Sequence, residues 1–585
     1  MSILPAWTRD YPRERLAADL LAGLIVAILV IPQSLAYALL AGLPPQAGLY
    51  VSIFPVIAYA LLGSSMTQAV GPVAITAIMT FSLLSPLATP GSPQYIALAA
   101  GVSLLSGLLI LAAGLLRMGF LAQLLSRPVI SGFISGSALL IVLSQMKLLL
   151  GVAPGGANSW QTLYSLVENL PRTNAATALI GGTALLLLHV SRQYLGAALI
   201  ALGVSPQHAA FPVRIMPLFV LALATFAVVT LDLDHRRGVA VVGQVQQGLP
   251  ALLVFVPDSA MLKTLAVPAL LLALIGMVQN ITMAQALASK RRERVDANRE
   301  LVGLGAANIV AAFYGGMPVG GGLSRSAINV SAGAQSPLAS IVSALVMLGF
   351  VAAGTQWFAR LPLAVLAASI VIAALGMIDA KSLRQAWNYD KADALALIGT
   401  GIGVVTLGLQ GGIALGVGLS LATLLYRAST PHIAVIGRIS GSEHFRNVER
   451  HGVETLPGVL FLRIDESLFF GNLNAVEARL ASELERAPAT HDVVMVMSAV
   501  NRVDTTAMEA LTDINRDLSS RNIRLHLAEI KGPVQDRLLT SALWATLSGA
   551  VHLSANMAFD ALAQPHPAAG RQDTPPRHDA APPGS

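Results

Sequence analysis

The chain has 585 residues, of which 55% are hydrophobic and only 12% are charged, and its formal net charge is +6. This composition is typical of an integral membrane protein and excludes an ordinary soluble enzyme. The chain contains no cysteine, which excludes disulfides, cysteine-ligated zinc and thiol catalysis. No nucleophile–base pair, metal-ligand cluster or basic patch with interleaved aromatic residues stands out, so we expect no enzymatic activity, no cofactor, no metal and no nucleic-acid partner.

The first 116 residues predict the start of a membrane domain. Met1 to Asp19 are polar and carry Arg9, Arg13 and Arg15, which the positive-inside rule assigns to the cytoplasm. From Leu20 to Leu116 there is no Asp, Glu, Lys, Arg or His, over a length far greater than the roughly 20 residues of one span. We find no short apolar run with a small-residue cleavage site at the N-terminus, and therefore expect no removable signal peptide.

Apolar segments along the chain predict fourteen membrane spans. They lie near Leu20–Leu40, Gly48–Leu62, Val70–Ser85, Tyr95–Leu116, Val129–Leu150, Ala175–His189, Met216–Leu231, Leu265–Ala286, Val302–Tyr314, Ser324–Ala332, Leu338–Ala353, Leu363–Leu375, Ala392–Leu407 and Gly412–Tyr426. If the N-terminus is cytoplasmic, turns after even-numbered segments are also cytoplasmic, and four of these turns carry Lys or Arg. Turns after odd-numbered segments are mostly neutral, as the positive-inside rule requires. The loop Asp232–Lys263 departs from this pattern, but it is long and mixed in sign.

Two of the segments are short and interrupted in the same way. Val70–Ser85 begins with Gly71 and Pro72, and Ser324–Ala332 follows three glycines, Gly320–Gly322. They are third in the first seven segments and third in the second seven, and seven is odd, so the two halves form an inverted repeat. Such paired interruptions are typical of a transporter's central site, where half-helix N-termini meet near the bilayer midplane. The alternative is that each is a kinked packing helix.

Arg325 lies in the second interrupted segment and is the only charged residue between Leu301 and Ala359. A charge at bilayer depth costs roughly 2.5–3.5 kcal/mol on insertion scales, and such a residue therefore indicates a functional site. A helix N-terminus presents unpaired N–H groups and the positive end of the helix dipole, which together bind anions. We interpret Met317–Gly333 as the centre of an anion site. The alternative is that Arg325 pairs with a backbone carbonyl or extends to the membrane interface.

Charged residues become frequent after Tyr426, and the pattern changes to that of a small α/β domain. Buried strands are predicted at Val459–Ile464, Asp492–Met497 and Ile523–Glu529, and helices at Leu473–Arg486 and Thr506–Arg521. The last stretch is rich in Pro and Ala and predicts disorder. We place the domain boundaries at 1–430, 431–565 and 566–585.

Several long motifs resemble the sulfate permease (SulP) family of anion transporters, over nearly the whole chain. PQSLAYALLAGLPPQAGLY (Pro32–Tyr50) is similar to the family's first-helix signature, GPVAI (Gly71–Ile75) to its third helix, and Asp296–Gly333 to its ninth and tenth. Pro431–Leu562 resembles the family's cytoplasmic STAS domain, with RIDESLFFGN (Arg463–Asn472) and VDTTAMEAL (Val503–Leu511) at its landmarks. The resemblance implies an α-helical polytopic membrane protein with 14 transmembrane segments in a 7+7 inverted repeat, a core domain moving against a gate domain, and usually a homodimer.

The resemblance also implies the positions of the anion site. They are Gln33 and Tyr37 in the first helix, Val73 and Ala74 at the start of the third, Gln279 in the eighth, and Gly322, Leu323, Ser324 and Arg325 at the start of the tenth. The amide of Gln33 can donate to an oxyanion. The alternatives are an interhelical hydrogen bond for Gln33 and a packing role for Tyr37.

Position 279 departs from the pattern of many relatives, which carry an acidic residue there that is implicated in proton or sodium coupling. A glutamine has no proton to exchange and is a poorer sodium ligand than a carboxylate. We therefore do not expect coupling to a proton or sodium ion through Gln279, and exchange, facilitated flux or coupling elsewhere stay open. The alternative for this stretch is that Asn280 or Thr282 serves only in polar packing.

Charge favours sulfate as the substrate. Two helix N-termini contribute roughly half an elementary charge each and Arg325 one more, and a total of about +2 suits a dianion. Bicarbonate, chloride and a dicarboxylate remain alternatives, because helix-dipole charges depend strongly on their environment. We predict a secondary transporter that moves an inorganic anion by alternating access across a plasma membrane, the bacterial inner membrane, with its N-terminus and STAS domain in the cytoplasm.

Two functions other than anion transport by a carrier fit parts of the sequence. A nucleobase-type carrier of the same fold is disfavoured by Arg325 and by the STAS-like tail, whereas an anion channel, or a sensor whose output is the STAS domain, stays open. In soluble relatives of that domain a hydroxyl beside the corresponding Asp is phosphorylated, and here Thr505 and Thr506 follow Asp504. We expect instead that Thr506 caps the helix it begins. A cytoplasmic partner of the STAS domain is a further expectation that the sequence leaves unidentified.

Overall fold

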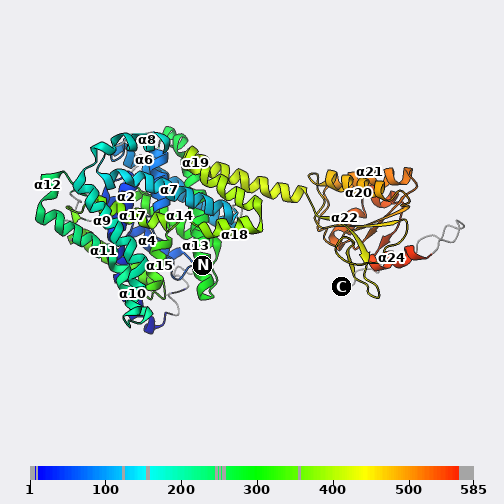
Figure 1. The fold of residues 1–585 in the computed structure, drawn as a ribbon, viewed down its shortest axis with the longest axis horizontal. Coiled ribbons are helices and arrows are strands. Elements are labelled where there is room, and N and C mark those ends of the chain that lie inside the picture. The colour runs from blue at the N-terminus through cyan, green and yellow to red at the C-terminus, as the bar shows by residue number, and fades with distance from the viewer. Residues whose placement is uncertain are drawn as a thin grey trace, which may run out of the picture. The chain divides into compact units, whose positions relative to one another are not determined.

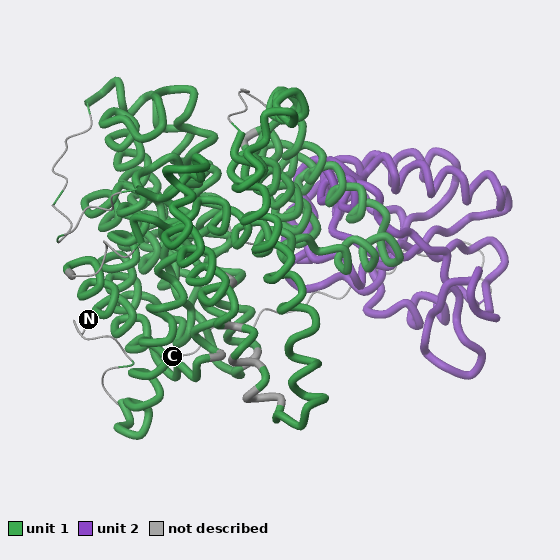
Figure 2. Tube along the Cα trace, turned by 60° about the vertical axis from the view of Figure 1, so that its left-hand side comes forward, with its two compact units in different colours: residues 1–421 green, residues 422–585 purple. Residues whose placement is uncertain are grey.

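The structure is a computed structural model, drawn in Figure 1, and it describes Trp7 and residues 11–120, 126–152, 159–243, 248, 252, 258–353 and 358–564. At 206–208, 210, 211, 214, 290, 323, 324, 331, 353 and 410 the backbone alone is described. The chain divides into two compact units, Met1–Leu421 and Ala422–Ser585, which Figure 2 distinguishes by colour. The tail predicted at 566–585 lies outside the described residues.

The first unit is built from helices. In chain order its helices are η1 (Arg13–Arg15), α2 (Leu16–Leu40), α3 (Pro45–Tyr50), α4 (Phe54–Leu62), α5 (Ala74–Leu84), α6 (Pro93–Leu115), α7 (Arg127–Leu150), α8 (Ser159–Asn169), η3 (Leu170–Arg172), α9 (Ala175–Val190), the π-helical turn η4 (Ser191–Leu195), α10 (Gly196–Ala201), α11 (Pro206–Leu231), α12 (Leu233–Arg237), α13 (Ser259–Arg291), α14 (Ala297–Phe313), α15 (Leu323–Ser331), α16 (Leu338–Ala353), α17 (Leu363–Leu375), α18 (Ala380–Tyr389) and α19 (Lys391–Ser429), which continues into the second unit.

These helices form a multi-pass membrane domain. Among the described residues, nine helical stretches are long and apolar enough to cross a bilayer, and three shorter apolar helices accompany them. Large apolar side chains such as Leu179, Phe226 and Leu407 are exposed, as expected of side chains that face lipid. Each of the fourteen predicted segments overlaps a helix. The last two are the halves of α19, which bends at Gly408, where φ is 77°. The number of crossings stays a prediction.

The first helix begins earlier than the sequence pattern predicts, at Leu16 and not at Leu20. Asp19, assigned to a polar flank, lies inside this helix and is fully buried. Its carboxylate accepts hydrogen bonds from the Tyr11 hydroxyl (2.7 Å), the backbone N–H groups of Gln335 (2.7 Å) and Ser336 (3.1 Å), and the Ser336 hydroxyl (2.6 Å). Because these donors satisfy the carboxylate, Asp19 is tolerated inside the helix, whereas the sequence pattern alone predicts a helix that begins after it.

Two interrupted segments meet in the middle of the first unit. The two-residue strands β1 (Val70–Gly71) and β2 (Gly320–Gly321) pair antiparallel, with Val70 opposite Gly321 and Gly71 opposite Gly320. Glycine is needed here because a Cβ on Gly321 would lie 2.3 Å from Nε2 of Gln68, far inside the normal separation of nonbonded atoms. The interruptions predicted from Gly and Pro are therefore a shared strand pair and not independent kinks.

The second unit is an α/β domain around a six-stranded sheet. Its strands are β3 (Ile433–Arg438), β4 (Phe445–Asn447), β5 (Val459–Ile464), β6 (Asp492–Val496), β7 (Arg524–Ala528) and β8 (Val551–His552), in the order β4-β3-β5-β6-β7-β8. β5 to β8 are parallel and β3 is antiparallel to both of its neighbours. The helices are α20 (Leu473–Arg486), α21 (Thr505–Ser520), α22 (Gly532–Leu538), α23 (Ala542–Thr546) and α24 (Ala555–Ala563).

Alternating side chains of the central strands cover both faces of this sheet. Val493 and Met495 pack with α20 and α21, whereas Val494 and Val496 pack with α24 on the opposite face (Figure 1). This arrangement confirms the small α/β domain predicted after Tyr426. The helix α21 is capped by Asp504, whose carboxylate accepts from the N–H of Ala507 at 2.8 Å. The expectation that Thr506 caps this helix is therefore wrong, because the carboxylate two residues earlier occupies that place.

A buried charge cluster joins strands β6, β7 and β8. Burial opposes ionisation of Asp492, but hydrogen bonds from Arg524, His491 and His526 outweigh it and hold the pKa of this carboxyl below its ordinary value. His526 and His552 stack with ring centroids 5.4 Å apart. Burial, together with the charge of His526, lowers the pKa of His552.

Candidate functional site

The N-termini of α5 and α15 converge on the β1–β2 pair. α5 begins three residues after Gly71 and α15 two residues after Gly321. No side chain caps either helix, since the N-cap residues are Val73 and Gly322. The first-turn N–H groups therefore have no partner within their own helices, and the positive ends of two helix dipoles meet at one place.

Neighbouring side chains hold the two tips in register. Asn308 of α14 donates to the carbonyl of Val319 at 3.0 Å and accepts from its N–H at 2.9 Å, which fixes the chain just before β2. The hydroxyl of Ser326 accepts from the N–H of Ala69 at 3.0 Å, across from α15 to the chain before β1. The hydroxyl of Thr76 in α5 donates to the carbonyl of Pro318 at 3.3 Å. Each half-helix is thus bonded to the chain just before the strand that precedes the other half-helix.

Arg325 lies in the first turn of α15 and is 5% exposed. Its NH1 donates to the carbonyl of Val70 at 3.2 Å, and its NH2 donates to the hydroxyls of Ser34 (3.1 Å) and Ser52 (3.3 Å). The guanidinium lies against β1 so closely that a Cβ on Gly71 would be 1.8 Å from NH1. Arg325 therefore pairs with a backbone carbonyl, which was one alternative considered from the sequence. The guanidinium nevertheless stays buried inside the helical unit, beside the two helix N-termini.

A small cavity of about 10 Å³ adjoins Arg325. Its lining includes Ser52, Ser340 and Ser343, together with apolar side chains of α2, α4 and α16. The Nε of Arg325 and the hydroxyl of Ser340 are buried without a protein partner. A cavity of this size is at the lower limit of the volume that a single water molecule needs.

Gln33 and Tyr37 lie one turn apart on α2, which packs against both α5 and α15. The Nε2 of Gln33 donates to the Tyr37 hydroxyl at 2.9 Å. Both residues belong to α2, so this hydrogen bond of Gln33 lies within one helix and not between helices. Pro32 precedes the pair inside the helix and removes a backbone donor at this level.

The remaining site residues predicted from the sequence lie at the tips themselves. Val73 is 6% exposed, Ala74 is 8% exposed and Gly322 is buried. Leu323 and Ser324 form the first turn of α15, but their side chains lie outside the described part of the chain. With Tyr37 also 5% exposed, the site residues whose side chains the structure describes at the two tips have little contact with solvent in this conformation.

Gln279 of α13 reaches the same strand pair. Its Nε2 donates to the carbonyl of Gly321 at 3.1 Å, and its Oε1 is buried without a protein partner. The residue next to it, Asn280, is fully buried, and its amide contacts Gln68 on one side and Glu300 on the other. Position 279 is therefore part of the scaffold of β2.

Sequence reasoning missed four residues of this centre. Ser34 and Ser52, which bind the guanidinium, and Gln68 gave no signal beyond being polar in apolar surroundings. Glu300 directly precedes Leu301 and lies outside the predicted segment Val302–Tyr314. In the structure it is fully buried in α14. The charge sum of about +2, made from Arg325 and two helix tips, is incomplete because it omits this carboxylate.

Comparison with known proteins identifies relatives over the whole chain. The model described as Sulfate permease family matches residues 16–400, and the STAS domain model matches residues 452–546. A probable sulfate transporter of Mycobacterium tuberculosis (MT1781) is 32% identical over 537 residues, which cover 92% of this chain and 93% of that protein. Sulfate transporter 4.1, chloroplastic, of Arabidopsis thaliana is 32% identical over 550 residues, covering 92% of this chain and 78% of that protein.

A solved structure shares the fold. The structure of the murine Solute Carrier 26 family member A9 (Slc26a9) anion transporter in the inward-facing state superposes with a TM-score of 0.83 and 22% sequence identity. The match covers 96% of this chain and 94% of the murine chain. It therefore includes the helical unit and the C-terminal α/β unit alike.

Proposed function

Because this chain belongs to the sulfate permease family of membrane anion transporters, which are not enzymes, we propose that it carries sulfate across the plasma membrane by alternating access. The observation that carries the proposal is the strand pair β1–β2, which brings two uncapped helix N-termini and a buried arginine to one point inside the membrane domain. This combination stabilises a bound anion and repels a cation.

The backbone supplies the direct contacts to the anion in this proposal. NH1 and NH2 of Arg325 already donate to Val70, Ser34 and Ser52, so the guanidinium acts mainly through its charge. The first-turn N–H groups of α5 and α15 are the donors that remain without helical partners, and the Gln33 amide and Tyr37 hydroxyl stand beside them on α2. Sulfate, with four acceptor oxygens, suits such a ring of donors.

A movement of the helices must open this site. Val73, Ala74 and Tyr37 are at most 8% exposed, so an anion cannot reach the tips without a change in how neighbouring helices pack. In an alternating-access cycle the half-helices would move together as one body, because each is bonded to the chain just before the strand that precedes the other. We place the N-terminus and the STAS domain in the cytoplasm of a bacterial cell and expect a homodimer, as the sequence suggested.

Position 279 supports transport without proton coupling at that residue. The Gln279 amide is engaged with the Gly321 carbonyl, and it carries no titratable group. We therefore propose that Gln279 does not couple transport to protons, and that the anion moves by exchange, by facilitated flux or with coupling at another residue.

Purified full-length protein in liposomes tests the proposal. We expect uptake of radiolabelled sulfate that saturates, persists when proton and sodium gradients are abolished, and falls strongly in Arg325→Gln. Arg172→Gln removes the same charge from an exposed position of the same unit and should transport normally.

Competition and current measurements separate the rivals. Uptake of bicarbonate, chloride or fumarate that excess sulfate does not inhibit would refute sulfate as substrate. Steady ion currents in a planar bilayer would refute alternating access and favour a channel. Binding of sulfate without any uptake would favour a sensor.

A further inference from the structure

The segment from Gly63 to Gly71, which we call the 63–71 segment, follows α4, ends with β1 and contains no helix. Its final part is bonded to α15. Asn329 donates to the carbonyl of Thr67 at 2.9 Å, the hydroxyl of Ser326 accepts from the N–H of Ala69, and Arg325 donates to the carbonyl of Val70. Because this segment leads directly into α5, its position determines where one of the two anion-binding tips stands.

The beginning of the 63–71 segment is bonded to a single carboxylate, that of Glu300 in α14. Oε1 of Glu300 accepts from the N–H groups of Ser64 and Ser65 and from the Ser64 hydroxyl, each at 2.8 Å. Oε2 accepts from the Tyr59 hydroxyl and from Nδ2 of Asn280, the latter at 3.1 Å. Every one of these contacts comes from an N–H or O–H donor, which is the arrangement that stabilises a carboxylate anion in a buried place.

The same carboxylate is connected to the second strand through two amides. Asn280 donates to Glu300 with Nδ2 and accepts from Nε2 of Gln68 with Oδ1. Gln68 in turn lies against Gly321, where an added Cβ would be 2.3 Å from Nε2 and 2.8 Å from Oδ1 of Asn280. The side chains of Glu300, Asn280 and Gln68 therefore form one continuous network from α14 to β2.

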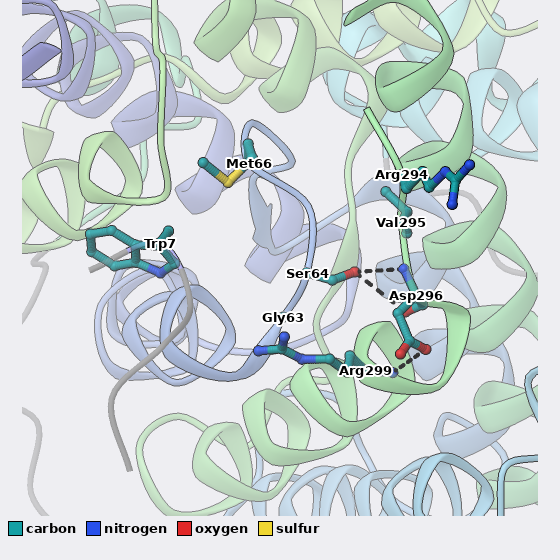
Figure 3. Close-up of a pocket in the computed structure, with 8 residues that line it drawn as sticks. All are labelled: Trp7, Gly63, Ser64, Met66, Arg294, Val295, Asp296 and Arg299. Carbon is teal, nitrogen blue, oxygen red and sulfur yellow. Dashed lines mark hydrogen bonds between the residues drawn. The ribbon is translucent and has the colours of Figure 1, made fainter. Parts of the chain in front are cut away.

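The other end of this network reaches the surface. Ser64 lines a cavity of about 320 Å³ together with Trp7, Met66, Asp296 and Arg299. Figure 3 shows the Ser64 hydroxyl between this cavity and the backbone of Asp296, with the Arg299 side chain extending toward Gly63. Solvent in the cavity thus comes close to the segment that Glu300 holds, although Glu300 itself is fully buried.

We propose that Glu300 is a positioning residue of the anion site, which acts as an anchor that holds the 63–71 segment and β2 in place. The proposal rests on the proposed function in that the site concerned is the one formed by α5 and α15. Glu300 does not touch the anion in this proposal. It acts through Ser64, Ser65, Asn280 and Gln68.

Glu300→Gln tests the anchor because it keeps the shape and removes the charge. The amide offers one acceptor oxygen and one NH2 group, and the NH2 must face groups that are themselves donors, so at least one buried donor loses its partner. We expect the half-saturation concentration for sulfate uptake to rise at least tenfold, to a similar extent between pH 6 and 8. Asp19→Asn is the matched control: it neutralises the other fully buried carboxylate, which has no bond to the 63–71 segment, and should leave the half-saturation concentration within threefold of wild type.

The outcome that overturns the proposal is an unchanged half-saturation concentration for sulfate in a folded Glu300→Gln variant. Should Glu300→Gln not fold, Asn280→Ala removes the link to Gln68 together with one donor to Glu300, and it leaves Glu300 with its donors from Tyr59, Ser64 and Ser65. It should raise the half-saturation concentration in the same direction, and unchanged affinity there refutes the proposal too.

Amide hydrogen exchange of the full-length protein distinguishes this proposal from the proposed function. We expect exchange in residues 63–71 to be at least tenfold faster in Glu300→Gln than in Asp19→Asn, with no anion present. Wild-type protein that fails to transport sulfate would refute the proposed function alone. Unchanged exchange in the 63–71 segment would refute the anchor alone.

Discussion

Gly71→Ala provides a sharp test of the position of Arg325. The added Cβ would stand 1.8 Å from NH1 and 2.5 Å from Cζ of the guanidinium. Since nonbonded heavy atoms normally stay about 3.5 Å apart, the guanidinium must retreat by roughly 1.7 Å. The end of an arginine side chain can move this far without displacing the backbone, so we expect the protein to fold.

The cost of this retreat lies in hydrogen bonds. The guanidinium bonds to Val70, Ser34 and Ser52 have lengths of 3.1–3.3 Å and do not survive a shift of that size unchanged. Losing one bond of a charged donor costs about 1.5–3 kcal/mol, and each 1.4 kcal/mol changes an affinity tenfold. We therefore expect sulfate to bind roughly 10- to 100-fold more weakly in Gly71→Ala, provided that the anion depends on the charge standing where it does.

Equilibrium binding of labelled sulfate to detergent-purified protein measures this change. Gly349→Ala in α16 is the matched control, because nothing lies within 4 Å of its added Cβ and alanine is the better helix former. It should bind as wild type does and melt at the same or a higher temperature. If Gly71→Ala binds sulfate with wild-type affinity while remaining folded, the guanidinium does not contribute to the site from its place beside β1.

Three further predictions concern Arg325, Gln279 and His552. Arg325→Lys keeps the charge but cannot bond Val70, Ser34 and Ser52 together, so sulfate affinity should lie between those of wild type and Arg325→Gln; affinity equal to wild type would contradict a need for the planar group. Gln279→Glu places a titratable group against the Gly321 carbonyl, and sulfate uptake should become dependent on a proton gradient; uptake that ignores the gradient would contradict this. Because the pKa of His552 is lowered in the folded domain, its contribution to stability is complete above about pH 6.5 and is lost as pH falls below that value. Hydrogen exchange in β7 and β8 should therefore accelerate from pH 7.5 to 5.5 after correction for the intrinsic rate, and His552→Gln should reduce this acceleration.

Much of the architecture could be predicted from the sequence because the signals are local. Gly71, Pro72 and the three glycines Gly320–Gly322 cannot continue a helix, and they mark the two interruptions where the strand pair forms. The continuous apolar run after Asp492, up to Met497, predicts a buried strand, and β6 occupies Asp492–Val496. The short strands β4 and β8 were not predicted, because two or three residues carry too little periodicity.

The interior of the site could be predicted only in part, because its contacts join residues that are far apart in the chain. Arg325 was located by its isolation in an apolar region, but nothing in the sequence connects it to Ser34, which lies 291 positions away. Glu300 and Asp19 each stand at the edge of an apolar run, where sequence pattern assigns a charge to solvent. Their burial depends on donors supplied by distant segments, such as Ser64 and Ser336, that only the folded chain brings near.

The pairing of Val70 with Gly321 has a consequence for how this protein is made. During synthesis the ribosome must add about 250 residues after Val70 before its partner strand exists, so the early helices enter the bilayer with an unpaired peptide segment among them. A nascent chain stopped before α13 also lacks Asn280, Glu300 and Arg325, the groups to which that segment bonds. Substitutions that weaken the late helices should therefore lower the amount of protein in the membrane, even where they leave the finished molecule competent.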